Sequence, residues 1–336
     1  MYKVFLNNGG GINDATDYYV SIIEKSIIKS GDRVQRVAAI SDIDKDDIVI
    51  CLCVYDYFFL WKNGYKKVIN WYQGVTPEEL NYYRLGMFTK LKRKIFLTAM
   101  ERLALKNCIC NIFVSESMLN HYRKKYGYRE DNYFIMPCFN EKYHAESFCN
   151  KKYEKPTFVY SGSADGWQCL DKTVALFKEI QTRIQNATLT IYSKDRTAVE
   201  DILQQYGVKA EIKYVPYTQL AEDMKSFKYG FLIRDNDPVN NVATPTKMSS
   251  YLASGVIPVF SDVIGDFKKV LSNNIYTIAL DEEMNGAQKL YELESVEIDV
   301  EEIAASYRSV FDTYYNEEHY VDKLSNLLKF YKKMMV

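Results

Sequence analysis

The residues best suited to chemistry lie in the stretch NNVATPTKMSSYLASGVIPVFSD, residues 240–262. Thr244 and the Pro-Thr-Lys that follows it precede a short pattern in which apolar residues recur at three- and four-residue spacing. Threonine is common at a helix N-cap, proline is favoured at the first helical position, and glycine, here Gly255, commonly follows the last turn. The spacing therefore predicts a short helix capped by Thr244.

This predicted helix start is suited to binding an anion. Backbone N–H groups without partners in a first turn, together with the helix dipole, favour negative charge there. Lys247 adds a full positive charge, Thr246 adds a hydroxyl donor, and Arg234 ends the preceding apolar run. We expect these residues to bind a diphosphate, with Thr244 and Asn241 beside them. The local pattern is also that of an ordinary capped helix whose lysine faces water.

The elements that must position these residues alternate between β-rich runs and helical patterns along the chain. Alternation of this kind, with glycine-bearing turns after strands, is typical of parallel, doubly wound sheets. It is interrupted at the aperiodic residues 141–156. We therefore predict an α/β protein with two Rossmann-like domains, 1–150 and 151–310, and a helical tail, 311–336, that crosses back to the first domain.

Parallel sheets bind ligands at the carboxyl ends of their strands. With two sheets facing across a cleft, three loops are expected to meet there, 9–13, 161–167 and 234–247. The small residues of the first two loops are candidates for binding the same diphosphate: Gly10, Gly11, Gly162 and Ser163.

Composition sets only broad limits on function. The 336 residues are 47% hydrophobic and 26% charged, with a formal net charge of −1, which is ordinary for a globular protein and gives no indication of a nucleic-acid partner. No apolar run approaches the ~18 residues of a membrane span, and the first residues lack a signal-peptide pattern. The two C-x-C pairs lie in apolar runs and do not have zinc-site spacing. We expect a cytoplasmic protein without a bound metal.

The carboxyl-terminal half resembles the donor-binding half of GT-B glycosyltransferases, particularly the retaining GT4 family (glycosyl transferases group 1). The segment TPTKMSSYLASGVIPVFSD carries the specific part of the resemblance, and TFVYSGSADGWQCLDKTVALF and KYVPYTQLAEDMKSFKYGFLI follow the same order of elements. The resemblance implies a GT-B architecture, with Arg234 and Lys247 as catalytic residues that stabilise the leaving diphosphate. It also implies that Val215, Tyr217 and Ser250 bind the nucleoside.

Two departures from the family pattern bear on activity. Val242 and Ser250 stand near the positions of the two acids of the family's E-x7-E motif, and Gln168 stands where a basic residue often follows the glycine loop. We expect a metal-independent enzyme of the hexosyltransferase type, since the acidic run DND at residues 235–237 is interpreted as a polar loop. Asp56 and Gln73 are candidates for contacts with the sugar or the acceptor.

The resulting hypothesis is a retaining glycosyltransferase of bacterial surface polysaccharide synthesis, with a nucleoside-diphosphate sugar as donor and a glycan or lipid-linked acceptor, and without a cofactor. The missing acids leave a second reading open, a non-catalytic protein of the same fold that binds a nucleotide or a glycan. A nucleotide-sugar epimerase or a phosphorylase of this architecture is a weaker alternative. A dinucleotide-dependent dehydrogenase is disfavoured because NNGGGINDA lacks the G-x-G-x-x-G spacing.

Residues 84–106 are basic, with apolar residues interleaved among seven lysines and arginines and only Glu101 as an acid. A helix of this composition is suited to the anionic inner face of a membrane, where a lipid-linked acceptor would lie. A basic helix that faces water would have the same composition.

Overall fold

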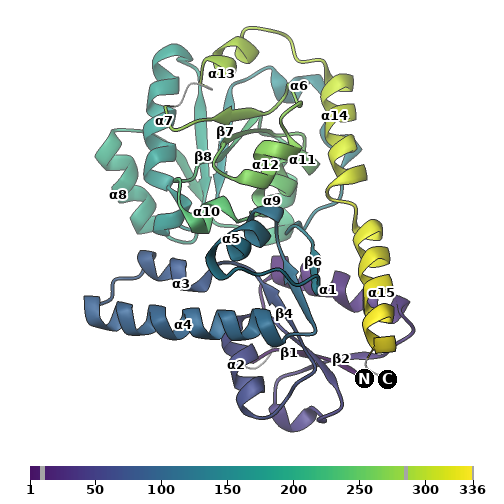
Figure 1. The fold of residues 1–336 in the computed structure, drawn as a ribbon. Helices are drawn as coiled ribbons and strands as arrows, with labels where there is room; N and C mark the ends of the chain where they lie inside the picture. The colour runs from purple at the N-terminus through teal and green to yellow at the C-terminus, as the bar shows by residue number, and fades with distance from the viewer. Residues whose placement is uncertain (8–11, 284–286, 335–336) are drawn as a thin grey trace. The chain divides into compact units, whose positions relative to one another are not determined.

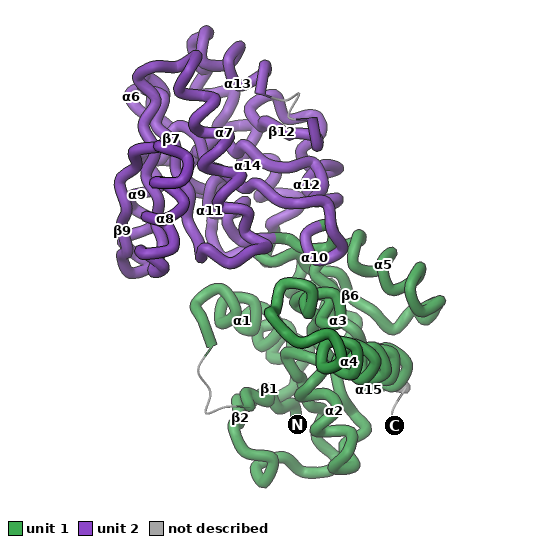
Figure 2. Tube along the Cα trace, turned by 90° about the vertical axis from the view of Figure 1, so that its left-hand side faces the viewer, with its two compact units in different colours: residues 1–138, 241–244, 316–336 green, residues 139–240, 245–315 purple. Residues whose placement is uncertain are grey.

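The computed structural model describes residues 1–7, 12–283 and 287–334. The chain divides into two compact units (Figure 2). Unit 1 comprises residues 1–138, 241–244 and 316–336, and unit 2 comprises residues 139–240 and 245–315. Each unit has one parallel six-stranded sheet with helices packed against it (Figure 1), so the α/β class predicted from the alternation is confirmed.

The sheet of unit 1 has the strand order β2-β1-β3-β4-β5-β6. Its strands are β1 (Tyr2–Phe5), β2 (Val34–Val37), β3 (Ile48–Cys51), β4 (Val68–Tyr72), β5 (Cys110–Phe113) and β6 (Tyr133–Ile135). The helices of the unit are α1 (Asp14–Lys29), α2 (Val54–Lys62), α3 (Thr76–Glu79), α4 (Met87–Asn107), α5 (Glu116–Tyr126) and α15 (Glu317–Met334).

The core of unit 1 explains why these segments form strands. Strands β1, β4 and β5 are buried along their whole length, which is the environment that continuous apolar runs require. Trp71 on β4 stacks on Tyr19 of α1, with ring centres 3.9 Å apart. The Tyr19 hydroxyl donates to the carbonyl of Met136 at 2.7 Å. The Tyr19 ring is thus buried while its hydroxyl group is hydrogen-bonded.

The last helix, α15, belongs to unit 1 although the chain reaches it from unit 2. It packs along α1, and the ring of Tyr320 meets that of Phe134 on β6 edge-on, at 6.3 Å. Glu317 accepts a hydrogen bond from Tyr18 at 2.8 Å. The helix before it, α14 (Val300–Thr313), is part of unit 2, so the chain crosses at residues 315–316 rather than at 310.

The sheet of unit 2 has the strand order β12-β11-β10-β7-β8-β9. Its strands are β7 (Thr157–Ser161), β8 (Thr188–Tyr192), β9 (Glu211–Lys213), β10 (Tyr229–Leu232), β11 (Ile257–Ser261) and β12 (Ile278–Leu280). The helices are α6 (Asn150–Tyr153), α7 (Leu170–Arg183), α8 (Arg196–Tyr206), α9 (Tyr217–Met224), α10 (Pro238–Asn241), α11 (Lys247–Ala253), α12 (Gly265–Val270), α13 (Ala287–Glu294) and α14.

Residues 141–156, the aperiodic stretch at the expected domain boundary, form part of unit 2. The Tyr143 hydroxyl donates to the carbonyl of Ala304 at 3.0 Å, and that of Tyr153 donates to the carbonyl of Gly255 at 2.8 Å. The segment lacks periodicity because aromatic side chains at irregular positions anchor it. The first crossing between the units therefore lies at residues 138–139, before the boundary expected at residue 150.

A buried lysine in this segment makes the stability of the protein dependent on pH. Lys152 is only 6% exposed and donates to the carbonyl of Ser254. Burial lowers the pKa of Lys152 to about 7, whereas an unfolded lysine titrates near 10.4. Between these values the unfolded chain binds the extra proton, so this residue makes stability rise with pH from about 7 to about 10.

We therefore expect Lys152→Met to flatten the rise in the free energy of unfolding over that range. Urea denaturation at several pH values measures it, with Lys151→Met, an exposed neighbour, as the control. An unchanged slope in Lys152→Met would show that the ammonium is not the titrating group.

No helix in the described parts of the chain is long and apolar enough to cross a membrane.

Candidate nucleotide site

Helix α11 is the short helix predicted from the TPTK stretch, but it starts later than expected. Its first helical residue is Lys247 and its N-cap is Thr246, which makes no capping bond through its side chain. Gly255 follows the C-cap residue with φ 68°, as predicted for the glycine that ends the helix. The helix has seven residues, so its dipole is weaker than the sequence argument assumed.

The prediction that Thr244 caps this helix is wrong. Thr244 is 3% exposed, and its hydroxyl accepts from the backbone N–H of Cys138 at 3.0 Å and donates to the carbonyl of Val114 at 3.2 Å. These partners all belong to unit 1, as does the segment 241–244 that contains Asn241. The hydroxyl is thus engaged in holding this segment against unit 1, two residues before the cap.

Unit 2 contains a pocket of about 340 Å³ next to the start of α11. It also lies against the residues that follow the carboxyl ends of β7, β8 and β9, the edge at which a parallel sheet binds ligands. The pocket brings together seven residues that the sequence analysis proposed for a nucleoside diphosphate. They are Gly162, Ser163, Val215, Tyr217, Thr246, Lys247 and Ser250.

Two lysines, Lys194 and Lys247, line this pocket, and Lys247 is the one at the start of α11. Its Nζ donates to Oε1 of Gln168 at 2.6 Å and lies 4.4 Å from the centre of the Tyr160 ring. Burial and the nearby Arg234 guanidinium lower the pKa of Lys247 well below that of a free lysine. The ammonium is therefore poorly neutralised by the protein itself, and an anion in the pocket would favour its charged form.

Gly162 allows this close approach of the lysine. Its φ of 153° lies in a region that favours glycine, and a Cβ built on it would lie 2.6 Å from Lys247 Nζ. Any larger residue would displace the ammonium or the loop after β7. The glycine loop is thus needed where the sequence analysis placed it, and its neighbour Ser163 lines the same pocket.

Arg234 follows β10, is 6% exposed, and is not among the residues that line the pocket. Its guanidinium donates to the backbone carbonyl of Gln168 at 2.9 Å and to Oε1 of the same residue at 2.7 Å. The Gln168 oxygen therefore accepts from both Arg234 and Lys247. Gln168 stands where the family pattern often has a basic residue. Its side-chain oxygen instead links the two basic residues, Arg234 and Lys247, by accepting a hydrogen bond from each.

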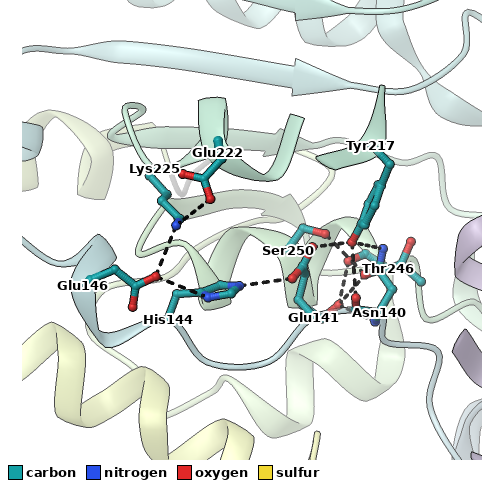
Figure 3. A network of polar contacts seen from close by, with 10 residues as sticks. Asn140, Glu141, His144, Glu146, Tyr217, Glu222, Lys225, Thr246 and Ser250 are labelled. Carbon is teal, nitrogen blue, oxygen red and sulfur yellow. Dashed lines mark hydrogen bonds and ion pairs between the residues drawn. The ribbon is translucent and has the colours of Figure 1, made fainter. Parts of the chain in front are cut away.

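Asn140 and Glu141 are among the pocket residues that were not expected from the sequence (Figure 3). Asn140 Nδ2 donates to the Tyr217 hydroxyl at 2.8 Å, and its Oδ1 accepts from the Ser250 hydroxyl at 3.3 Å. The Glu141 carboxylate accepts from the same Tyr217 hydroxyl and lies 3.2 Å from Nε2 of His144. No motif marks this loop, because it lies more than a hundred residues before Ser250 and meets it only in the fold.

The two acceptor candidates lie elsewhere, in unit 1. Asp56 accepts from Nδ2 of Asn7 at 3.1 Å, and Nε2 of Gln73 donates to the carbonyl of Leu52 at 3.0 Å. Both follow strands of the parallel sheet, β3 and β4, and so lie at its carboxyl edge. Gly10 and Gly11 lie outside the described residues.

The acidic run at residues 235–237 is engaged in local contacts. Asp235 forms an ion pair with Lys172, and the Asp237 carboxylate accepts from the backbone N–H of Val239 at 2.8 Å, at the start of α10. Among the described residues, no group of three or more His, Cys, Asp or Glu side chains is arranged to hold a metal ion.

Comparison with known proteins gives a likeness in structure but not in sequence. No family model matches the chain, and no curated protein matches it. TarM from S. aureus, solved with Fondaparinux, alpha-GlcNAc-glycerol and UDP, superposes with a TM-score of 0.63 at 13% identity, over 84% of this chain and 55% of TarM. This chain thus spans about half the length of TarM.

Superpositions on two other structures cover a larger share of the other chain. The E. coli trehalose-6-phosphate structure bound with UDP-2-fluoro glucose superposes with a TM-score of 0.62 at 11% identity, over 93% of this chain and 78% of that one. The α,α-trehalose 6-phosphate synthase of Burkholderia multivorans superposes with a TM-score of 0.64 at 9% identity, over 95% of this chain and 78% of the synthase. With its two parallel six-stranded sheets and flanking helices, the chain has the GT-B fold of these proteins.

Proposed function

We propose that the protein is a glycosyltransferase that moves a sugar from a nucleoside-diphosphate sugar to a hydroxyl group of a glycan or a lipid-linked acceptor. The observation that carries the proposal is the pocket of unit 2, which combines a half-buried lysine, a glycine loop and polar groups within about 340 Å³. UDP is the first nucleotide to test, because two of the structures of the same fold contain UDP or a UDP sugar.

The proposed chemistry follows from the charges of the pocket. The bond between the sugar's anomeric carbon and the diphosphate oxygen breaks, a bond to the acceptor oxygen forms, and the acceptor's proton leaves towards the departing phosphate. Negative charge therefore grows on the diphosphate, and Lys247 would stabilise it, with Arg234 acting through Gln168. Retention of the anomeric configuration, as in GT4 enzymes, and a cytoplasmic role in surface polysaccharide synthesis belong to the same proposal.

One observation favours the alternative, a non-catalytic protein that binds a nucleotide or a glycan. Position 250 has a serine instead of the family's second acid, and its hydroxyl pairs with Asn140. An assay that separates the two readings measures release of UDP from UDP-glucose and UDP-GlcNAc, together with thermal stabilisation by UDP, ADP and GDP. A ligand at a hundred times its dissociation constant adds about 2.7 kcal/mol to the free energy of unfolding.

Stabilisation by a nucleotide together with release of UDP supports the transferase. Stabilisation without turnover, with a range of sugar and glycan acceptors, supports the binding protein. Stabilisation by none of the nucleotides contradicts the transferase and the nucleotide-binding form of the alternative.

Sugar transfer, or hydrolysis of the donor, is expected to persist in EDTA. Lys247 would provide the charge that a divalent cation provides in other transferases. The check is the rate of UDP release before and after chelation. A rate that disappears with EDTA and returns with Mg²⁺ or Mn²⁺ would contradict this assignment.

We expect Glu141 to bind the ribose of the donor, in place of the acid that the family has at position 250. A carboxylate oxygen is a suitable acceptor for the two ribose hydroxyls, and this one lines the pocket beside Tyr217 and Ser250. Glu141→Gln should therefore reduce the affinity for UDP by about ten-fold, and the affinity for 2′-deoxy-UDP by much less. Calorimetric titration measures both.

Glu222→Gln, a nearby exposed carboxylate paired with Lys225, is the matched control and should leave both affinities unchanged. If Glu141→Gln lowered the affinities for UDP and 2′-deoxy-UDP equally, Glu141 would maintain the conformation of its loop and would not bind the ribose.

A further inference from the structure

The first half of α4 exposes a row of large apolar side chains. Met87, Phe88, Leu91 and Ile95 are 87%, 80%, 57% and 63% exposed. Phe88, Leu91 and Ile95 follow Met87 by one, four and eight residues, which places all four side chains within an arc of roughly 100° on the helix surface. An apolar face of this width normally packs against the core of a protein. The buried residues of α4, Leu97, Met100, Glu101, Ala104 and Leu105, all lie in the second half of the helix. Four of them point to a different face, and Leu105 has the direction of Met87 but lies five turns later.

Positive charge surrounds this apolar face. Lys90, Lys92, Arg93 and Lys94 lie in the same three turns, and no aspartate or glutamate occurs between Glu79 and Glu101. On a helix of 3.6 residues per turn, Lys92 and Lys94 flank the apolar arc on opposite sides. The helix therefore has an apolar centre with basic margins.

Aromatic side chains of α2 pack against α4 next to this face. Helix α2 packs against α4, and Phe96 meets Phe58 edge-on with ring centres 5.4 Å apart. Phe58 in turn stacks near Trp61, which is 44% exposed. In Figure 1 the amino-terminal half of α4 extends away from the sheet of unit 1.

We propose that this part of α4, residues 87–96, is a membrane-binding surface that lies in the headgroup region of an anionic phospholipid bilayer. Its four apolar side chains would enter the boundary between headgroups and acyl chains, and the lysines and the arginine would contact lipid phosphates. Lys92 and Lys94 form no ion pair with any residue that the structure describes. Cations on both sides of an apolar row complement an anionic bilayer in charge, whereas a protein partner would have to supply acids on two sides of an apolar groove.

The proposal concerns unit 1 alone and does not depend on the nucleotide pocket. Its relation to function is that a surface of this kind would bring the protein to a lipid-linked acceptor. Binding to vesicles and binding to UDP are separate measurements, so either proposal can fail without the other.

The test is co-sedimentation of the full chain with vesicles of phosphatidylglycerol and phosphatidylcholine, compared with phosphatidylcholine alone. We expect saturable binding to the anionic vesicles that weakens as salt rises, because exposed charges are screened. Phe88→Ser combined with Leu91→Ser should weaken binding at least ten-fold, and so should Lys92→Glu combined with Lys94→Glu. These side chains are exposed, so folding should be retained, and circular dichroism verifies it.

The matched control is Ile28→Ser combined with Phe330→Ser, which removes two apolar side chains, 62% and 56% exposed, from α1 and α15. It should leave vesicle binding unchanged. Wild-type protein that stays in the supernatant with anionic vesicles would overturn the proposal. So would a self-associated protein that becomes monomeric in the Phe88→Ser and Leu91→Ser variant without any change in vesicle binding, since the face would then contact a second copy of the chain.

Discussion

Alanine in place of Lys247 is expected to weaken UDP binding by at least ten-fold. The ammonium lines the pocket, and its partners in the protein are neutral groups, the amide oxygen of Gln168 and the ring of Tyr160. A hydrogen bond to a charged group contributes roughly 1.5–3 kcal/mol, which corresponds to roughly ten-fold or more in the dissociation constant. Arg234→Ala should also weaken binding, because the guanidinium holds Gln168.

The pH dependence of this affinity gives a second readout. Burial and Arg234 lower the pKa of Lys247, so the empty pocket favours the neutral amine. A bound diphosphate favours the ammonium, and binding therefore takes up a proton. The affinity for UDP should fall as pH rises, and the fall should be absent in Lys247→Ala.

Calorimetric titrations in buffers of different ionisation enthalpy measure both the affinity and the proton uptake. Lys172→Ala is the matched control, because that lysine is exposed, pairs with Asp235 and does not line the pocket. Unchanged UDP affinity in both Lys247→Ala and Arg234→Ala would refute the assignment of the diphosphate site.

The substitution Glu101→Ala is expected to lower the free energy of unfolding of unit 1 strongly. Glu101 is fully buried on α4 and accepts from the hydroxyls of Tyr122 and Tyr126, at 2.9 and 2.6 Å, and from Lys125 Nζ at 3.0 Å. Burial raises the pKa of this carboxyl, and Lys125 opposes the shift. The three donors come from α5, so a single carboxylate joins α5 to the helix that carries the proposed membrane-binding surface.

Removal of this carboxylate takes away the short hydrogen bonds of both tyrosine hydroxyls and leaves that of Tyr122 with the Gly74 carbonyl at 3.4 Å. The Lys125 ammonium keeps its ion pair with Glu78 at 2.8 Å. We expect the free energy of unfolding of unit 1 to fall by about 3 kcal/mol. Urea denaturation followed by tryptophan fluorescence measures it in a Trp167→Phe background, since Trp61 and Trp71 lie in unit 1 and Trp167 lies in unit 2. Glu101→Gln, which keeps the shape and one acceptor, should lose less.

Glu200→Ala provides the comparison at an exposed pair, with Arg196 one helical turn away. Such pairs contribute about 0.3–0.5 kcal/mol. If Glu101→Ala were no more destabilising than Glu200→Ala, the buried network would not be what holds α4 to α5.

The fold was predictable from sequence because parallel strands buried on both faces appear as apolar runs, and helices appear between them. The boundaries between the units were less predictable. Residues 141–156 have no periodicity, yet Tyr143 and Tyr153 anchor them to unit 2. Thr244 matched the composition of an N-cap, but composition does not register that Cys138 and Val114 compete for its hydroxyl.

Part of the pocket's lining was predictable from sequence. Gly162, Thr246 and Lys247 belong to local patterns, a glycine loop after a strand and a lysine at a helix start, and the structure brings them together. Asn140 and Glu141 have no local pattern, because their place in the pocket depends on a contact with Tyr217 from a distant part of the chain. Contacts of this kind become visible only in three dimensions.

The most direct test of the central claim is hydrogen–deuterium exchange of the full chain with and without UDP, since it locates a bound nucleotide without requiring turnover. We expect slower exchange in the segments that line the pocket, residues 140–141, 161–163, 192–194, 214–224 and 246–254, and unchanged exchange along residues 87–96. Slower exchange confined to other segments, or no change with UDP, ADP or GDP at saturating concentration, would contradict this claim.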